Sequence, residues 1–188
     1  MLLLLVVAIG WGVGRGLTAG FDTAGLMAMR DGPVGVWRAV TVFGDSGVRI
    51  AVALLAAGGL LIARRRAEAV WLAATVAGGI ALNSGLKLLF ARARPALLPH
   101  LDPVGSFSFP SGHAANTMVL ALCLALLAPA RWRRAAVGLA IVAAVAIGLS
   151  RLALAVHWPS DVAAGWIEGV GWVLLSCGLF GRRVARHG

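Results

Sequence analysis

Two histidines stand beside residues that suit them to phosphate chemistry. His157 is followed four residues later by Asp161 across a predicted turn, so the carboxylate can hold one ring nitrogen and leave the other nucleophilic. His113 follows Ser111 and Gly112 at the predicted start of a helix, where the N–H groups of the first turn form an anion site. Each group alone also fits a structural role, as a His–Asp pair at a helix junction or as a capped helix with an interfacial histidine.

Three cations accompany the histidines. Arg151 interrupts an apolar run, where an unpaired charge costs on the order of 3 kcal/mol or more, so we expect it to face inward with an anionic partner. Lys87 and Arg94 are seven residues apart and would share one face of a helix that continued that far, although either alone also fits a cation that reaches toward water. A phosphomonoester requires charge neutralisation, an in-line nucleophile and a proton donor, and these residue types supply all three.

The composition indicates that these residues are positioned within a lipid bilayer. The chain has 188 residues, of which 60% are hydrophobic and 13% charged, and its mean hydropathy is +0.91. A soluble domain of this length could not bury so much apolar surface. The net charge of +10 is concentrated in short spacers between apolar runs, which favours a role in membrane topology and argues against a nucleic-acid partner.

Six apolar stretches predict an all-α fold, a polytopic bundle of six transmembrane helices in one domain, residues 1–188. The predicted spans are 2–20, 47–63, 68–90, 112–130, 134–156 and 160–181. Arg15 interrupts the first of them, which leaves an uninterrupted run shorter than the roughly 20 residues that a bilayer requires. Between the first two spans, residues 21–46 predict an outer loop with an interfacial helix, and by location they are the best candidates for substrate-specific contacts.

Arginine clusters predict the orientation. With six spans, all three clusters fall on one side, which should be cytoplasmic together with both termini. The clusters are Arg64, Arg65 and Arg66; Arg131, Arg133 and Arg134; and Arg182, Arg183 and Arg186. The loops 91–111 and 157–159 then lie on the opposite, periplasmic or extracellular, side of a prokaryotic inner membrane. Trp71, Trp132 and Trp158 lie near the predicted span ends, as interfacial tryptophans do.

Taken together, the three groups of polar residues resemble, in order and spacing, the signature of the type 2 phosphatidic acid phosphatase (PAP2) superfamily. The matching motifs are Lys87-x6-Arg94-Pro95, Pro110-Ser111-Gly112-His113 and Ser150-Arg151-x5-His157-x3-Asp161. The resemblance implies a PAP2/haloperoxidase-like core within the six-span bundle and leaves roughly residues 1–45 outside the motifs. The apolar composition favours the membrane lipid phosphatase branch over the soluble vanadium haloperoxidases.

The resemblance also implies a role for each matching residue. His157 would attack phosphorus and become a phosphohistidine, oriented by Asp161, while His113 would protonate the leaving alcohol and then activate water. The implied phosphate-binding residues are Lys87, Arg94, Ser111, Gly112 and Arg151. Neither a metal nor another cofactor is expected, since the cations and a helix N-terminus would neutralise the charge of the phosphate in place of a metal. Outside the signature, Arg92 would add to the positive field, and Glu168 would be paired or would face a polar interior.

The expected function is metal-independent hydrolysis of a membrane lipid phosphate, of the phosphatidic acid or phosphatidylglycerol phosphate type, at the outer face of the membrane. One alternative is hydrolysis of undecaprenyl diphosphate, because the signature residues recognise only the phosphate and do not specify the lipid attached to it. Another is transfer of the phosphoryl group to a lipid or saccharide acceptor through the same site. A transporter or scaffold with a phosphate pocket would be expected to lack one histidine, and both are present. The oligomeric state is left open.

Overall fold

Residues 1–184 fold into eight α-helices, and the all-α prediction is confirmed. The computed structural model describes the backbone of residues 1–184 and the side chains of residues 1–180, and no strand occurs in this part of the chain. The helices are α1 (Leu2–Gly14), α2 (Ala19–Ala28), α3 (Val34–Val42), α4 (Ser46–Ile62), α5 (Arg66–Phe90), α6 (Gly112–Leu127), α7 (Ala130–Ala153) and α8 (Pro159–Val184).

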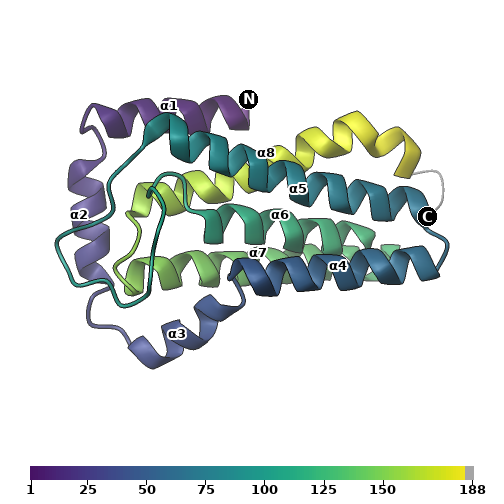
Figure 1. The fold of residues 1–188 in the computed structure, drawn as a ribbon, viewed down its shortest axis with the longest axis horizontal. Coiled ribbons are helices and arrows are strands. Elements are labelled where there is room, and N and C mark those ends of the chain that lie inside the picture. The colour runs from purple at the N-terminus through teal and green to yellow at the C-terminus, as the bar shows by residue number, and fades with distance from the viewer. Residues whose placement is uncertain (185–188) are drawn as a thin grey trace.

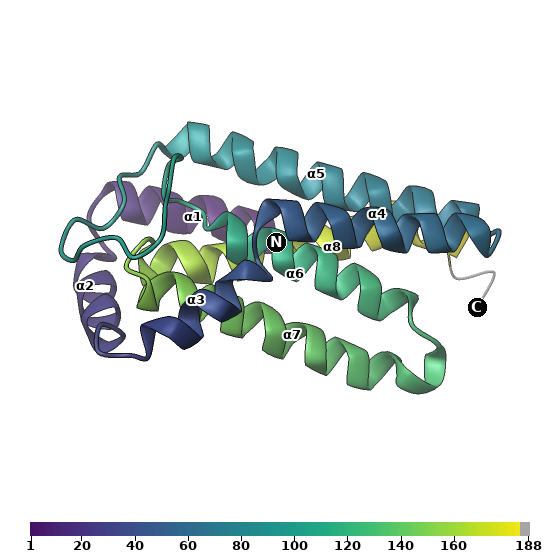
Figure 2. The ribbon, with the colours of Figure 1, turned by 60° about the horizontal axis from the view of Figure 1, so that its bottom comes forward.

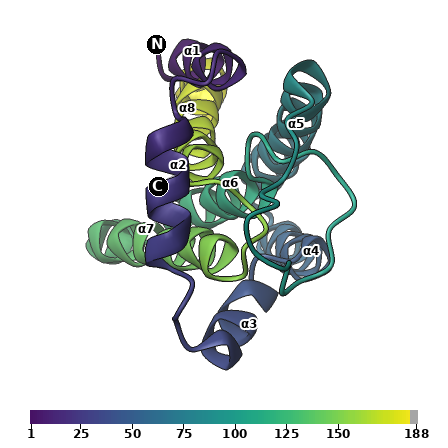
Figure 3. The ribbon, with the colours of Figure 1, turned by 90° about the vertical axis from the view of Figure 1, so that its left-hand side faces the viewer.

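Six of the helices form a bundle and the other two lie at one end of it. Helices α1 and α4 to α8 run broadly along the long axis of the molecule, whereas α2 and α3 lie at the end where α5 and α7 finish (Figure 1). Helix α6 lies inside the bundle and packs against α4, α5, α7 and α8 (Figure 2). Seen from that end, α2 lies across the bundle, and it contacts α7 and α8 (Figure 3).

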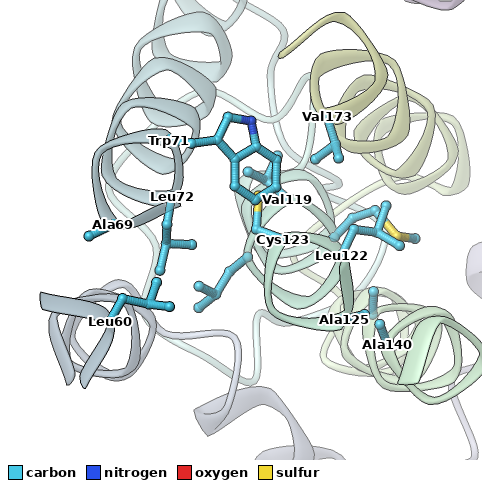
Figure 4. Packing of buried hydrophobic residues seen from close by; sticks show 13 residues of the cluster. Leu60, Ala69, Trp71, Leu72, Val119, Leu122, Cys123, Ala125, Ala140 and Val173 are labelled. Atoms are coloured by element: carbon cyan, nitrogen blue, oxygen red, sulfur yellow. The ribbon is translucent and has the colours of Figure 1, made fainter. Parts of the chain in front are cut away.

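The core of the bundle is apolar and surrounds α6. Trp71 and Leu72 of α5 face Val119 and Cys123 of α6, with Val173 of α8 on the far side (Figure 4). Trp71 lies near the start of α5, close to the predicted span end, and is only 4% exposed, because this face of α5 packs on α6.

Close packing of α8 on α6 depends on a small residue. A Cβ atom at Gly165 would lie 2.7 Å from the carbonyl oxygen of Ser111 and 3.0 Å from the Cβ of Ala114. Glycine therefore allows α8 to approach the start of α6, where the polar residues of the second motif lie.

The predicted number of six spans is not confirmed. Four stretches are long and apolar enough to cross a membrane: Val34–Ile62, Arg66–Phe90, Ala130–Ala153 and Pro159–Phe180. A fifth is reached if α1 and α2, which meet at 94°, form one broken span. Helix α1 has only 13 residues, and α6 has 16, which extend about 24 Å against a hydrocarbon thickness of about 30 Å. The predicted first span, 2–20, is therefore wrong at its end, because the helix stops at Gly14 and the chain turns.

The remaining predicted spans each coincide with a helix, and the segment predicted as an outer loop with an interfacial helix is mostly helical. Residues 21–46 contain most of α2 and all of α3. The arginines at 64–66 and 131–134 lie at the end of the bundle away from α2 (Figure 1). Arg182 and Arg183 belong to the last turns of α8 with side chains outside the described set, and Arg186 lies outside the described residues.

Candidate active site

The three motifs meet in one cavity at the end of the bundle that α2 and α3 cover. The connection from α5 to α6, the start of α6, and the turn from α7 to α8 all lie at this end (Figures 1 and 3). The cavity has a volume of about 300 Å³ and is also bordered by the start of α4. Its charged and histidine side chains are Asp45, Arg49, Lys87, Arg94, His113, Arg151 and His157.

His157 presents its two ring nitrogens to different surroundings. Nδ1 lies 3.5 Å from Oδ2 of Asp161 and 3.4 Å from Oγ of Ser108, behind the cavity wall. Nε2 lies 3.3 Å from Nη1 of Arg94, which lines the cavity. Burial lowers the pKa of His157 to about 3, against a smaller opposing effect of Asp161, so the imidazole is neutral at physiological pH. A neutral ring can attack phosphorus through Nε2 while Nδ1–H faces the carboxylate.

Asp161 is buried and held by several donors, so it is a fixed support for the imidazole. Its Oδ2 accepts hydrogen bonds from Ser108 Oγ at 2.5 Å and from the Trp158 backbone N–H at 2.9 Å. Its Oδ1 accepts one from Arg92 at 2.5 Å. Position N3 of α8 suits a carboxylate as well, because the first turn of a helix favours negative charge.

Arg92 connects this support to the N-terminal part of the chain. Its Nη2 lies 2.6 Å from Oδ2 of Asp22 on α2, and its Nη1 contacts both Ser160 and Asp161. Asp22 is buried and also accepts hydrogen bonds from the Ser160 backbone N–H and hydroxyl, each at 2.8 Å. Arg92 was predicted only to add positive field, but it is ion-paired, and its guanidinium lies over the Trp158 ring, 5.4 Å from the ring centroid.

His113 lies on a more open side of the cavity. Its Nε2 is 3.1 Å from Oδ1 of Asp45, whose side chain is 50% exposed. The ring packs against Gly44, where a Cβ atom would lie only 2.7 Å from His113 Cδ2. Glycine at this position therefore lets the chain pass close enough to His113 for Asp45 to reach it.

The cations of the cavity are anchored to the surrounding loops. Lys87 Nζ donates to the Phe107 carbonyl at 2.6 Å. Arg94 donates from Nε to the Ser106 carbonyl at 2.8 Å and from Nη1 to the Val156 carbonyl at 2.6 Å. Burial and the charge of Arg151 lower the pKa of the Arg94 guanidinium, as expected for cations crowded together away from water.

Arg151 has the anionic partner that its position within an apolar run demands. Its Nη1 lies 2.8 Å from Oδ2 of Asp102 and donates to Thr41 Oγ1 at 2.6 Å. The sequence predicted the need for such a partner but did not identify it. Glu168, predicted to be paired, accepts a hydrogen bond from Asn83 at 2.9 Å.

Two placements differ from the expected arrangement. Lys87 and Arg94 do not share a helix face, because α5 ends at Phe90, Ala91 adopts a left-handed conformation, and Arg94 lies in the following connection. The two side chains nevertheless line the same cavity. Ser111 is fully buried at the N-cap of α6, and its hydroxyl has no partner among the described residues, whereas Gly112 borders the cavity.

A second cavity of about 570 Å³ adjoins the first. Lys87, Arg94 and residues 104–106 border both. The second cavity extends along the exposed residues Ser84 and Leu88 of α5 and past Phe107, and its walls are mainly apolar.

Several residues of the site lie outside the three motifs. Asp22 and Asp45 fall within residues 21–46, which were predicted as contacts by location only, whereas Arg49, Asp102 and Ser108 were not predicted individually. Their polar character in apolar surroundings is a signal, but only the fold shows which of them meet. Within the described residues, no group of three or more histidine, cysteine, aspartate or glutamate side chains is placed to hold a metal ion.

Comparison with known proteins agrees with the motifs. The model of the PAP2 superfamily matches residues 68–185. The chain is 34% identical over 165 residues to a decaprenylphosphoryl-5-phosphoribose phosphatase of Mycobacterium tuberculosis, covering 84% of this chain and 86% of the relative. It is 32% identical over 192 residues to a lipid A 1-phosphatase of Rhizobium johnstonii, covering 83% and 75% of the two chains.

A solved structure shares the fold along the whole chain. The crystal structure of a transmembrane PAP2 type phosphatidylglycerolphosphate phosphatase from Bacillus subtilis superposes with a TM-score of 0.90 at 25% identity, covering 100% of this chain and 97% of that one. These relatives act on different phosphorylated lipids. The chain belongs to the PAP2 superfamily and is a multi-pass membrane phosphatase that hydrolyses phosphate esters.

Proposed function

We propose that this chain hydrolyses a lipid phosphate, of the phosphatidic acid or phosphatidylglycerol phosphate type, through a phosphohistidine at His157. The observation that carries the proposal is the orientation of His157, with Nδ1 against Asp161 and Nε2 beside Arg94 in a cavity lined by cations. A dianionic phosphoryl group satisfies these cations, and its phosphorus comes within reach of Nε2.

The reaction then proceeds in two displacements. Nε2 of His157 forms a bond to phosphorus while the bond to the leaving oxygen breaks, and His113 donates a proton to that oxygen. Water next attacks the phosphohistidine, His113 accepts the proton of the water, and inorganic phosphate leaves. Lys87, Arg94, Arg151 and the Gly112 backbone N–H bind the phosphoryl oxygens. Ser111 lies buried at the N-cap of α6, where its backbone N–H donates to the Asp161 carbonyl at 2.9 Å and links the second motif to the third.

The adjoining apolar cavity supports a lipid as the substrate. Its shared border at Lys87 and Arg94 places an apolar surface directly beside the phosphate-binding cations. An acyl or prenyl chain attached to the bound phosphate can follow this surface along α5 toward the bilayer.

We further propose that α1 and α4 to α8 each cross the membrane, with the bilayer thinned around α6 or its flanking residues in the interface. The arginines at one end of the bundle support a cytoplasmic location of that end, and of both termini. The candidate active site then faces the periplasm or the cell exterior. Labelling of single cysteines at 31 and 131 with a membrane-impermeant thiol reagent in intact cells tests this: position 31 should react and position 131 should not.

A polyprenyl-linked phosphate is a second candidate substrate. The relative from Mycobacterium tuberculosis, by its name, acts on a decaprenyl-linked phosphoribose, and the alignment spans most of both chains. Undecaprenyl diphosphate belongs to the same chemical class.

A substrate panel tests the proposal. Purified protein in detergent with a metal chelator should release phosphate from a glycerophospholipid phosphate or a polyprenyl phosphate, and preference for one class by more than about tenfold would decide between them. Absence of hydrolysis of every lipid phosphate in the panel would contradict the proposed function.

A further inference from the structure

One cation of the cavity comes from outside the three motifs and has no assigned task. Arg49 lies one turn into α4 and borders the cavity together with Asp45 and Ser46. Its Nε donates to the Gly44 carbonyl at 2.8 Å, which fixes the plane of the guanidinium. Among the described residues, no acceptor binds its two terminal nitrogens. The donors of an oriented guanidinium are thus available to a ligand.

The position of Arg49 relative to the histidines defines which part of the substrate it meets. Attack by His157 requires the leaving oxygen on the opposite side of phosphorus, where His113 donates its proton. Asp45 contacts His113 at 3.1 Å, and Gly44 packs against its ring. The segment 44–49 therefore borders the part of the leaving group next to phosphorus, and the lipid chain beyond it passes Lys87, Arg94 and the loop 104–106 into the second cavity.

The positive charge of Arg49 beside the leaving group favours leaving groups that are themselves anionic. A monoester such as phosphatidic acid releases a neutral diacylglycerol, which offers hydrogen-bond acceptors but no negative charge to a guanidinium. A lipid diphosphate releases a lipid monophosphate, and phosphatidylglycerol phosphate releases a lipid that retains a phosphodiester. Each of these leaving groups carries an anionic phosphate, and a planar guanidinium binds phosphate oxygens in a bidentate manner.

We propose that Arg49 binds a second phosphate carried by the leaving group, so that the preferred substrates are lipids with two phosphates of which the outer one is removed. This inference rests on the proposed function and narrows it. The chemistry is unchanged: the outer phosphoryl group passes to His157 and then to water, and the lipid departs with its inner phosphate bound at Arg49.

A pair of lipids that differ only in the second phosphate tests the proposal. Dioleoylglycerol diphosphate and dioleoyl phosphatidic acid are compared in detergent micelles by phosphate release, with wild type, Arg49→Gln and Arg49→Lys. Arg49→Gln should reduce kcat/KM for the diphosphate by about tenfold to a hundredfold more than for phosphatidic acid, the range expected for a hydrogen bond to a charged group. Arg49→Lys should restore part of the difference, because it keeps the charge without the planar donors.

Arg30→Gln is the matched control, since it removes the same charge from an exposed arginine that does not border the cavity. It should leave the ratio of the two kcat/KM values unchanged. Equal effects of Arg49→Gln on both lipids, or no effect on either, would overturn the inference while leaving the proposed function intact. Failure of the wild type on both lipids would instead contradict the proposed function.

If Arg49→Gln is inactive on both lipids, a binding measurement replaces the kinetics. Inorganic diphosphate should raise the Tm of the wild type more than inorganic phosphate does at equal concentration, and Arg49→Gln should remove that difference. An unchanged difference would overturn the inference.

Discussion

The two histidines of the cavity have contrasting supports. His157 is buried, and Asp161 behind it is held by Ser108, Trp158 and Arg92 with no exposure to solvent. His113 is 20% exposed, and its partner Asp45 is a single half-exposed carboxylate. One side of the site is thus a closed network that extends to Asp22 on α2, and the other is a single contact at the edge of the cavity.

The contrast follows from what each side must do. A nucleophile that forms a covalent bond requires a fixed direction of attack and a neutral ring, and burial among immobile partners provides both. A group that donates a proton to one molecule and accepts it from the next must meet both the leaving group and water. The open side of the cavity at His113 permits this exchange of protons, but it holds the imidazole less rigidly.

Replacing the histidines should give the largest losses of activity and should distinguish the role of His157 from that of His113. His157→Ala should reduce kcat by about 10⁴-fold or more, because it removes the proposed nucleophile and with it the covalent step. His113→Ala should reduce it by about 10² to 10⁴-fold on a lipid substrate. Phosphate release with purified variants measures both.

The His113→Ala loss should shrink with a leaving group as acidic as p-nitrophenol, which needs no proton donor, whereas the His157→Ala loss should not. An equal loss for both variants on both substrates would contradict the division of roles.

Arg92→Ala should weaken both activity and fold, because it leaves Asp22 and Asp161 buried without their cation. Loss of one partner of a buried ion pair costs about 3–5 kcal/mol, and loss of a residue that orients a catalytic group typically costs about 10- to 100-fold in activity. Chemical unfolding and phosphate release measure the two effects.

Arg92→Lys should recover stability better than activity, since an ammonium group cannot contact Asp22, Ser160 and Asp161 in the same planar arrangement. Arg30→Ala, at an exposed ion pair, should change the unfolding free energy by no more than about 0.5 kcal/mol. Activity of Arg92→Lys equal to the wild type would show that Arg92 has no positioning role.

Asp45→Asn should have the smallest effect. Among the described residues, its half-exposed carboxylate forms a hydrogen bond only with His113, so we expect about a threefold to tenfold loss of kcat and little change in stability. A loss as large as that of Arg92→Ala would mean that the open side is as dependent on its support as the closed side.

The sequence predicted the residues that line the cavity better than it predicted the contacts that support those residues. Local spacing located the helices, as 68–90 for α5 and 47–63 for α4, because apolar runs and their polar ends are local signals. The motifs located the residues that line the cavity, through a family resemblance. Neither source placed Asp22 beside Arg92, since that contact joins positions 70 residues apart and depends on how α2 folds across the bundle.

The number of spans is not confirmed, for a related physical reason. Hydropathy measures composition, but it does not show that the helix starting at Leu2 stops at Gly14 or that α6 ends after 16 residues. Similarly, an anionic partner for Arg151 was required by its apolar surroundings, yet Asp102 lies in an irregular connection whose path no periodic pattern describes.

Trapping of the covalent intermediate tests the central claim most directly. Protein is mixed with p-nitrophenyl phosphate, quenched in alkali, which preserves phosphohistidine, and digested for mass spectrometry. Phosphate is expected on His157 in the wild type, more of it in His113→Ala, where water is no longer activated, and none in His157→Ala. Phosphate on another residue, or no phosphorylated His157 in a His113→Ala protein that still releases p-nitrophenol, would contradict it.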